Sequence, residues 1–337
     1  MALLKHPRVD AAEQRATEAL KRELSEQELF SVAPFDEAET ERTGAESYSY
    51  WRSTLRAFRH NRVAMFLLSL LVIIVLFTFI QPLLPGQFDP NLANNTVNAK
   101  GQTVPMKNTP PDSVHWLGTN NIGQDLWARL WAGTRNSLFI GIAVALIEAL
   151  VGIVMGVLWG YVRKLDFFFT ELYNVLDNIP TTIVLILVSF ILRPGMGTLI
   201  FAMSVTGWIG MARFVRNQVL IIRDRDYNVA SRTLGTATWR IILRNLLPYL
   251  VSVIMLRMAL SIPGAIGSEV FITYIGLGLP SDVPSLGKLI TEGRKLLTSP
   301  SKRYQLIYPT IVLSVVTVSF YIIGNAFSDA ADPRNHL

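Results

Sequence analysis

Residues 227–248 read YNVASRTLGTATWRIILRNLLP and lie between two long apolar stretches of the chain. Arg232, Arg240 and Arg244 fall inside this segment, together with several Thr and Asn residues. A segment this polar cannot face lipid, because charged side chains in hydrocarbon are costly. The segment therefore predicts a membrane protein in which one long polar loop stands outside the bilayer.

The composition of the whole chain also places it among proteins that cross the membrane several times. Half of the residues are hydrophobic, 17% are charged, and there are no cysteines, which excludes disulfides and thiolate metal sites. The net charge of +6 does not indicate a nucleic-acid partner, because Lys and Arg gather beside the apolar segments, where they set orientation. No apolar run follows Met1, so no signal peptide is expected.

Apolar runs of the length needed to cross a hydrocarbon core predict an all-α membrane protein with six transmembrane helices. The predicted spans are residues 63–80, 137–161, 167–192, 198–212, 249–275 and 309–326, with the fifth interrupted at Pro263-Gly264. Arg-rich or Lys-rich flanks precede the first span and follow the second and fourth. By the positive-inside rule, both termini are expected in the cytosol.

The segments between the spans are expected to differ in their location. Residues 1–62 form a cytosolic extension, in which residues 10–29 are either a helix or part of a loosely ordered tail. Residues 81–135 are external and include a short interfacial helix, indicated by Leu126, Trp127, Leu130 and Trp131 at helical spacing. The other expected segments are a five-span core (136–326) that includes the cytosolic loop 218–248, an external loop (276–308) and a cytosolic tail (327–337).

Small and charged residues inside the spans mark places where helices pack or a polar passage lies. A stripe of glycines recurs every four residues in the second span: Gly152, Gly156 and Gly160. The stripe predicts close helix packing, with a substrate-facing role as the alternative. Glu148 and Arg257 fall at similar expected depths, so we expect their side chains to approach each other. Glu269 is roughly 18 Å from Arg257 along one helix, too far for a direct pair.

The polar loop offers a surface that another protein can approach closely. Ser231 and Gly235 are expected on one helical face with Ala230 beside them, and Pro248 is expected to begin the next helix. A solvated loop without a partner is the alternative. The residues expected to carry the contact are Tyr227, Val229, Ala230, Ser231, Arg232, Leu234, Gly235, Trp239, Arg244 and Pro248.

This pattern resembles the coupling loop of bacterial ABC importer permeases, which docks in a groove of a cytosolic ATPase. The family pattern is Glu-Ala-Ala, three residues, Gly and a later Leu-Pro; the match is Val229-Ala230-Ser231, Gly235 and Leu247-Pro248, with Val229 in place of Glu. Residues 115–125, followed by Arg129, resemble the start of the permease core of the peptide-importing subfamily, which commonly has Asp and Arg at Asn120 and Gln124. Further matches are Glu269 and residues 275–278, 284–287 and 329–334, whereas Glu171, Asn174 and Asp177 depart from the commoner pattern.

The resemblance covers roughly residues 51–334 and implies the type I (MetI-like) importer permease fold. It implies the second permease subunit of an oligopeptide or dipeptide importer of the Gram-positive type, in the plasma membrane. The implied partners are a homologous permease in a heterodimer, two ATPase subunits that bind ATP and Mg, and an extracellular peptide-binding protein. Sister systems carry nickel or other small solutes, so these substrates stay open.

Motifs for other kinds of chemistry do not occur in the sequence. It contains no phosphate-binding loop and no His-Glu-x-x-His, so we expect no enzyme activity and no bound cofactor or metal in this chain. His115 is expected to pack within its loop. Two other classes stay open: a secondary transporter in which Glu148, Asp177 and Glu269 carry protons, and a membrane-embedded enzyme, for which no catalytic set is present.

Overall fold

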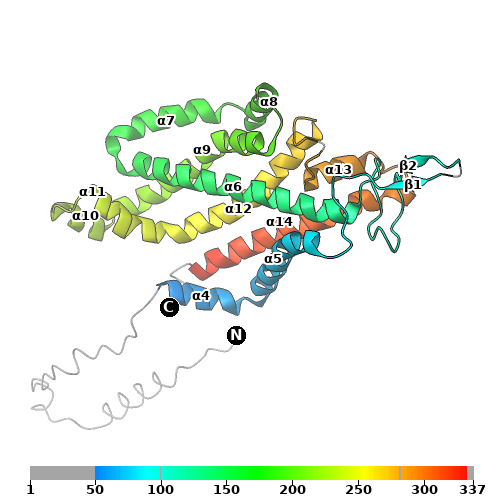
Figure 1. Cartoon of the computed structure of the whole chain (residues 1–337). Coiled ribbons are helices and arrows are strands. Elements are labelled where there is room, and N and C mark those ends of the chain that lie inside the picture. Colours follow the sequence, from blue (N-terminus) through cyan, green and yellow to red (C-terminus); the bar gives the residue numbers. More distant parts are fainter. Residues whose placement is uncertain (1–49, 99, 281, 332–337) are drawn as a thin grey trace, which may run out of the picture. The chain divides into compact units, whose positions relative to one another are not determined.

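The computed structural model describes residues 50–98, 100–280 and 282–331 of the chain (Figure 1). Within these residues the fold is helical, apart from one antiparallel hairpin of β1 (Asn95–Val97) and β2 (Thr103–Pro105). The helix expected within residues 10–29 lies outside the described residues. The polar loop with α10 and α11 and the hairpin lie at opposite ends of the long helices (Figure 1).

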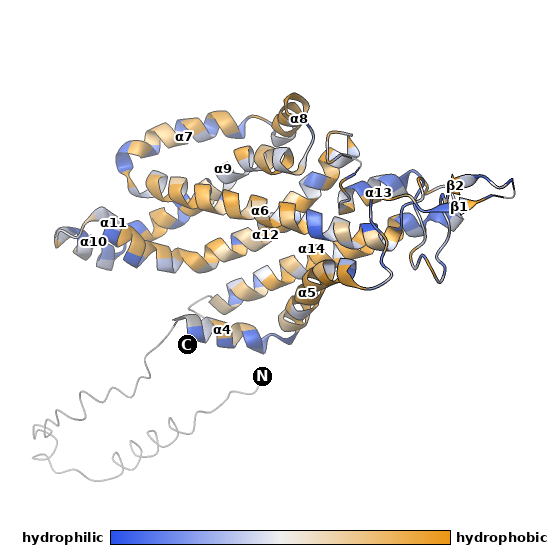
Figure 2. Cartoon of the chain, in the orientation of Figure 1, coloured by the Kyte–Doolittle hydropathy of each residue, from blue (hydrophilic) through white to orange (hydrophobic). Residues whose placement is uncertain are grey.

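Most of the described chain forms long apolar helices. Five of them are long and apolar enough to cross a membrane, and the bent pair of α7 and α8 makes a sixth if it counts as one span. Apolar residues cover the long helices, whereas polar residues gather at α10, α11 and around the hairpin (Figure 2). The five helices are α5 (Arg62–Ile80), α6 (Leu126–Tyr161), α9 (Met196–Arg223), α12 (Leu247–Tyr274) and α14 (Tyr304–Ala331).

The expected short interfacial helix is not a separate element. Its residues form the first turns of α6, which continues without a break into the predicted second span. The Asp125 side chain caps this helix by accepting a hydrogen bond from the Ala128 N–H at 2.8 Å, and no proline interrupts the helix afterwards. Trp127 and Trp131 instead form an aromatic cluster with Phe77 of α5.

The predicted third span is also not one straight helix. It divides into α7 (Arg163–Asp177) and α8 (Thr181–Ile191), which are bent by 76° relative to each other. Pro180 has no N–H to donate and disfavours the helical conformation at the residue before it, so the helix ends ahead of it. The polar face of α7 packs on α9, where Arg216 donates to Asp166 at 2.7 Å and Arg213 lies over the Tyr173 ring.

The remaining helices are longer than the sequence predicts. Helix α9 continues to Arg223, beyond the expected end of the fourth span at residue 212, and α14 begins at Tyr304 with Pro309 inside it. The interruption expected at Pro263-Gly264 is wrong, because α12 runs through both residues. Proline is tolerated inside membrane helices where neighbouring helices support the freed backbone groups. The loop 276–308, expected to be external, contains α13 (Leu286–Arg294).

A short helix that the sequence analysis did not predict, α4 (Tyr50–His60), precedes the first span. Its buried Phe58 joins Ala64 of α5 and Ala326 and Ala330 of α14 in one apolar cluster. Arg52, Arg56 and Arg59 stay exposed on it. Thr54 and Phe58 are both buried and lie four residues apart, on one face of the helix. An average of hydropathy along the chain does not detect such a one-sided pattern.

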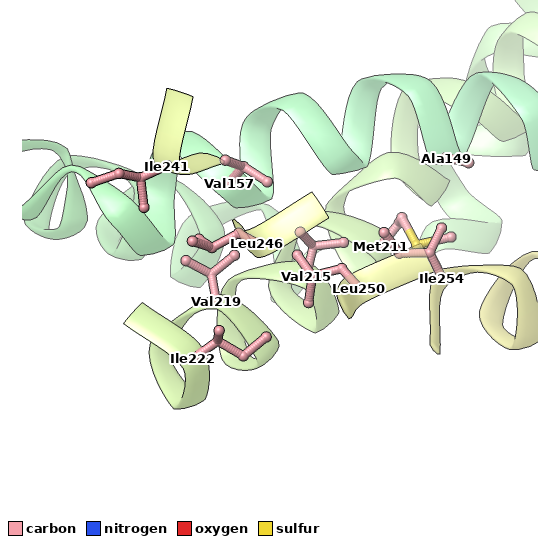
Figure 3. Close-up of a cluster of buried hydrophobic side chains, with 10 residues drawn as sticks. All are labelled: Ala149, Val157, Met211, Val215, Val219, Ile222, Ile241, Leu246, Leu250 and Ile254. Carbon is pink, nitrogen blue, oxygen red and sulfur yellow. The ribbon is translucent and has the colours of Figure 1, made fainter. Parts of the chain in front are cut away.

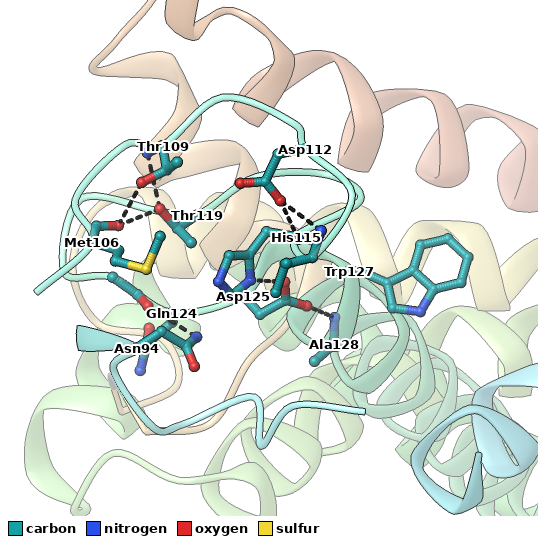
Figure 4. A network of polar contacts seen from close by, with 12 residues as sticks. Asn94, Met106, Thr109, Asp112, His115, Thr119, Gln124, Asp125, Trp127 and Ala128 are labelled. Carbon is teal, nitrogen blue, oxygen red and sulfur yellow. Dashed lines mark hydrogen bonds and ion pairs between the residues drawn. The ribbon is translucent and has the colours of Figure 1, made fainter. Parts of the chain in front are cut away.

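The segment between α5 and α6, expected to be external, is held together by a polar network (Figure 4). The buried His115 ring lies 2.8 Å from Asp125 through Nδ1, which links this loop to the cap of α6. Asp112 accepts hydrogen bonds from the backbone N–H groups of His115 and Val114, and these bonds lower the pKa of its carboxyl. His115 therefore packs within its loop, in agreement with the sequence-based expectation.

An amide pair stands at the two positions where the resembled subfamily has Asp and Arg. The Asn120 side-chain amide donates to Gln124 Oε1 at 2.9 Å, and Gln124 donates to the Asn91 carbonyl. Both side chains are buried. A neutral hydrogen-bonded pair thus occupies the place of an ion pair and avoids the desolvation of two charges.

Candidate functional site

The polar loop consists of three short helical pieces that lead into α12. Helix α10 (Asp226–Thr233) is followed by α11 (Thr238–Ile241) and a π-helical turn, η2 (Ile242–Leu246). Pro248 is the second residue of α12, as its missing N–H favours. We call residues 226–248 the coupling segment, after the loop that its sequence resembles.

Gly235 ends α10 and lies past its last helical residue. Its φ is +76°, the Thr236 N–H donates to the Ser231 carbonyl, and the Gly235 N–H donates to the Arg232 carbonyl. This pair of bonds is the Schellman arrangement, which requires the left-handed conformation that glycine adopts without a steric penalty. The expectation that Ser231 and Gly235 share one helical face is therefore wrong, because Gly235 is outside the helix.

The inner side of the coupling segment is fixed to the ends of the membrane helices. The fully buried Asn228 donates to the Ile222 carbonyl of α9 at 2.9 Å and accepts a hydrogen bond from Asn245 of η2 at the same distance. Ile241 and Leu246 are buried in a cluster with side chains of α6, α9 and α12 (Figure 3). A displacement of the coupling segment therefore reaches three long helices through packed contacts.

The outer side of the coupling segment exposes large apolar side chains. Their exposed fractions run from 41% for Val229 to 85% for Leu234. Ala230, Arg240 and Arg244 are also exposed, and Arg240 lies over the Trp239 ring at 5.6 Å. The apolar members of this surface are Tyr227, Val229, Leu234, Trp239 and Leu243. Apolar side chains gathered beside arginines on a polar loop are typical of a protein–protein contact.

Arg232 is directed to the chain itself and not to this outer surface. It donates to the Arg223 carbonyl at 3.1 Å and pairs with Asp224 at 3.3 Å. Hydrogen bonds from Arg223, with a further contribution from Arg232, lower the pKa of the Asp224 carboxyl. Asp224 thus holds the junction of α9 and α10 together at neutral pH.

The glycine stripe of α6 packs directly against α9. A Cβ added at Gly156 would lie 2.5 Å from the Ala212 carbonyl oxygen, and one at Gly152 would lie 2.5 Å from Met211 Cγ. At Gly160 the nearest atoms are those of Val219, at 2.9 Å. The geometry supports the packing interpretation of the stripe, since backbone and side-chain atoms of α9 fill the space beside each of these glycines.

Glu148 and Arg257 line one cavity of about 320 Å³ between α6, α8, α9 and α12. Ser261 donates to Glu148 at 3.1 Å. The ion pairs of the described residues do not include Glu148 with Arg257. The two side chains share a location, as expected, without forming a close pair.

Glu269 of α12 lies elsewhere, fully buried against the start of α13. It accepts hydrogen bonds from Ser285 at 2.7 Å, Thr273 at 3.0 Å and Ser137 at 3.2 Å. Ser285 also caps α13, and Ser137 accepts a hydrogen bond from the Leu286 N–H. The carboxyl group thereby connects α6, α12 and α13, and this set of contacts indicates a structural role.

Several of these connecting residues were not found from the sequence. Asn228, Asn245 and Ser285 are ordinary polar residues whose partners become evident only in three dimensions. Ser285 carried one usable signal, because Pro-Ser before an apolar run is typical of a helix start.

Comparison with known proteins shows to which family the chain belongs. Residues 149–336 match the model of the family described as binding-protein-dependent transport system inner membrane component. The chain belongs to this family. Residues 49–111 of this permease also match the N-terminal transmembrane domain of oligopeptide transport permease C.

Curated relatives match this permease over most of their length. It is 37% identical to the oligopeptide transport system permease protein AmiD of Streptococcus pneumoniae over 92% of this chain and 98% of that protein. It is 33% identical to OppC of Bacillus subtilis, an oligopeptide permease (91% and 97% covered), and 36% identical to the dipeptide permease DppC of the same species (86% and 87%).

A solved structure shares the fold. An inward-facing structure of the MetNI methionine ABC transporter aligns with a TM-score of 0.50 and 19% identity, covering 59% of this chain and 94% of that one. The MetI-like fold and the location in the membrane as a multi-pass permease are therefore confirmed.

Proposed function

We propose that this permease forms half of the translocation pathway of an ATP-driven importer of oligopeptides. It works in a heterodimer with a homologous permease, with two cytosolic ATPase subunits and an extracellular peptide-binding protein. ATP and Mg bind to the ATPase subunits, and this chain contributes no catalytic residue and no cofactor site.

The observation that carries the proposal is the two-sided construction of the coupling segment. Its outer side exposes Leu234 and Trp239 beside arginines, whereas its inner side buries Ile241 and Leu246 among three membrane helices. An ATPase seated on the outer side moves the segment when ATP closes the ATPase pair. The buried cluster passes this movement to α6, α9 and α12, which rotate against the partner permease.

The substrate class rests on the relatives. The alignments with the oligopeptide permeases of Streptococcus pneumoniae and Bacillus subtilis cover nearly the full length of those two proteins. Dipeptides are the second candidate, because the dipeptide permease of Bacillus subtilis is similar at 36% identity.

Proton-coupled transport has weaker support from the contacts. Asp177 lies 4.0 Å from Arg213 at the exposed face of α7, whereas Glu269 is enclosed by three hydroxyl groups. Glu269 lies eight residues, or about 12 Å, along α12 from Ser261, which donates a hydrogen bond to Glu148. The three carboxyl groups therefore do not form a continuous relay.

Uptake by cells that lack this chain and are then complemented tests the proposal. Labelled tri- to hexapeptides compete with one another for uptake, with dipeptides and nickel as alternative solutes. We expect complementation to restore oligopeptide uptake that depends on ATP. Restoration of nickel or dipeptide uptake alone would contradict the oligopeptide assignment.

A further inference from the structure

The cavity between α6, α8, α9 and α12 carries charges that the transport cycle described above does not use. Its polar wall is formed by Glu148, Thr206, Arg257, Ser261 and Ser268, and its volume is about 320 Å³. This volume is within the range of small-molecule sites, roughly 300–1,000 Å³. The cavity lies along helices that cross the membrane.

The Glu148 carboxylate is built into the wall. Ser261 Oγ donates to its Oε2 at 3.1 Å. Across from it, α9 has Gly207, where an added Cβ would lie 1.6 Å from Glu148 Oε1. Glycine at this position is thus what leaves room for the carboxylate. Glu148 is only half-buried, but a carboxylate on a membrane-spanning helix is still costly, so a site that makes room for one indicates a function for its charge.

Arg257 presents the opposite charge at the same cavity. Its side chain is exposed, and its nearest aromatic contact is Phe214, with the guanidinium 6.0 Å from the ring centroid. Arg257 precedes Ser261 by one helical turn, about 6 Å along α12. The two groups line the same cavity but do not form an ion pair among those of the described residues. An exposed guanidinium on a membrane helix needs water or an anionic ligand.

The geometry points to a binding site for the two charged ends of a zwitterionic peptide, which we call the station. The carboxylate of the peptide binds Arg257, whose planar fork matches a carboxylate, and the ammonium group binds Glu148. The hydroxyl groups of Thr206 and Ser268, on the same wall, already donate to the Met203 and Gly264 carbonyls of their own helices, so the recognition rests on the two charges. This inference rests on the proposed peptide transport and adds a binding site inside the permease, separate from the external binding protein. A longer peptide presents one end at a time.

Equilibrium binding to the purified importer in lipid nanodiscs, without the peptide-binding protein, tests this station. The probes are a labelled tripeptide with free ends, its N-acetylated form and its C-amidated form. In the unchanged protein we expect each block to weaken binding about tenfold or more, the loss of one hydrogen-bonded charge pair. In Arg257→Gln, amidation has no further effect, and in Glu148→Gln, acetylation has no further effect.

Matched variants separate binding from folding. Arg257→Lys keeps the charge and restores most of the sensitivity to amidation, and Ser268→Ala, on the same wall, leaves both sensitivities in place. Binding that does not saturate in the unchanged importer would overturn the proposed site. So would independent effects, in which blocking a peptide end weakens binding by the same factor in the substituted protein as in the unchanged one. Peptide uptake in cells, measured in parallel, reports on the proposed function separately: uptake without nanodisc binding refutes the station alone.

Discussion

Replacing Gly156 with alanine tests whether α6 and α9 are held together by direct backbone contact. The added Cβ would lie 2.5 Å from the Ala212 carbonyl oxygen and 2.7 Å from Val215 Cβ. The first of these atoms belongs to the backbone, so α9 has to move away. Overpacking of this kind costs about 1–3 kcal/mol.

Two other glycines calibrate the effect. At Gly160 the nearest atoms are side-chain atoms of Val219 at 2.9 Å, so the alanine variant requires a smaller shift. Gly267 in α12 has no atom within 4 Å of an added Cβ in the described chain. Alanine there is expected to stabilise the helix by about 1 kcal/mol, because glycine has a lower helix propensity than alanine. The expected order of stability is Gly267→Ala, the unchanged protein, Gly160→Ala and then Gly156→Ala.

The assay is thermal unfolding of the purified permease in detergent, followed by tryptophan fluorescence. A loss of 1 kcal/mol lowers the midpoint by about 2–4 °C in proteins of 150–250 residues, so Gly156→Ala is expected several degrees below the unchanged protein. The reasoning is refuted if Gly156→Ala unfolds at the same temperature as Gly267→Ala. That result would mean that the helices tolerate a side chain where the contact distances exclude one.

Three further substitutions test the coupling segment and the hydrogen bonds around Glu269. Gly235→Ala places a Cβ on a residue with φ of +76° and is expected to cost about 1–2 kcal/mol, seen as faster amide exchange in α10. Glu269→Ala leaves three buried hydroxyl groups without their acceptor and should lower the unfolding midpoint, at about 1–3 kcal/mol for an unsatisfied group; an unchanged midpoint would contradict the structural role of Glu269. The pKa of Asp224 is lowered, so its contribution is complete above the ordinary aspartate pKa of about 4 and fades as pH falls through the lowered value. Asp224→Asn should therefore increase α10 exchange at pH 7 and pH 5 alike; an effect at only one of these values would contradict this assignment.

The sequence predicted the features that depend on local composition. Apolar runs located the membrane helices, and four-residue spacing identified Gly152, Gly156 and Gly160 as a packing stripe. Depth counting predicted that Glu148 and Arg257 lie at a similar depth, because a rise of about 1.5 Å per residue is reliable within a straight helix, and the structure brings both to one cavity.

Features that depend on geometry between distant segments were missed or wrong. The hydropathy of residues 167–192 does not show the bend between α7 and α8. Pro180 was the one local signal for it, because the residue before a proline disfavours the helical conformation. Gly235 was assigned to a contact face, whereas the structure requires its left-handed backbone. The partners of Glu269 include Ser137, which is 132 positions away, and no spacing rule relates such residues.

Site-specific cross-linking at the outer side of the coupling segment tests the central claim most directly. The chain contains no cysteine, so a single Leu234→Cys substitution provides one attachment point for a photoreactive maleimide at a side chain that is 85% exposed. A Val97→Cys variant, exposed on β1 at the opposite end, serves as the control. In membranes containing the assembled importer, the account predicts a cross-link to an ATPase subunit from position 234 and none from position 97. Equal labelling from both positions, or no ATPase adduct at position 234 in an importer that still transports, would contradict it.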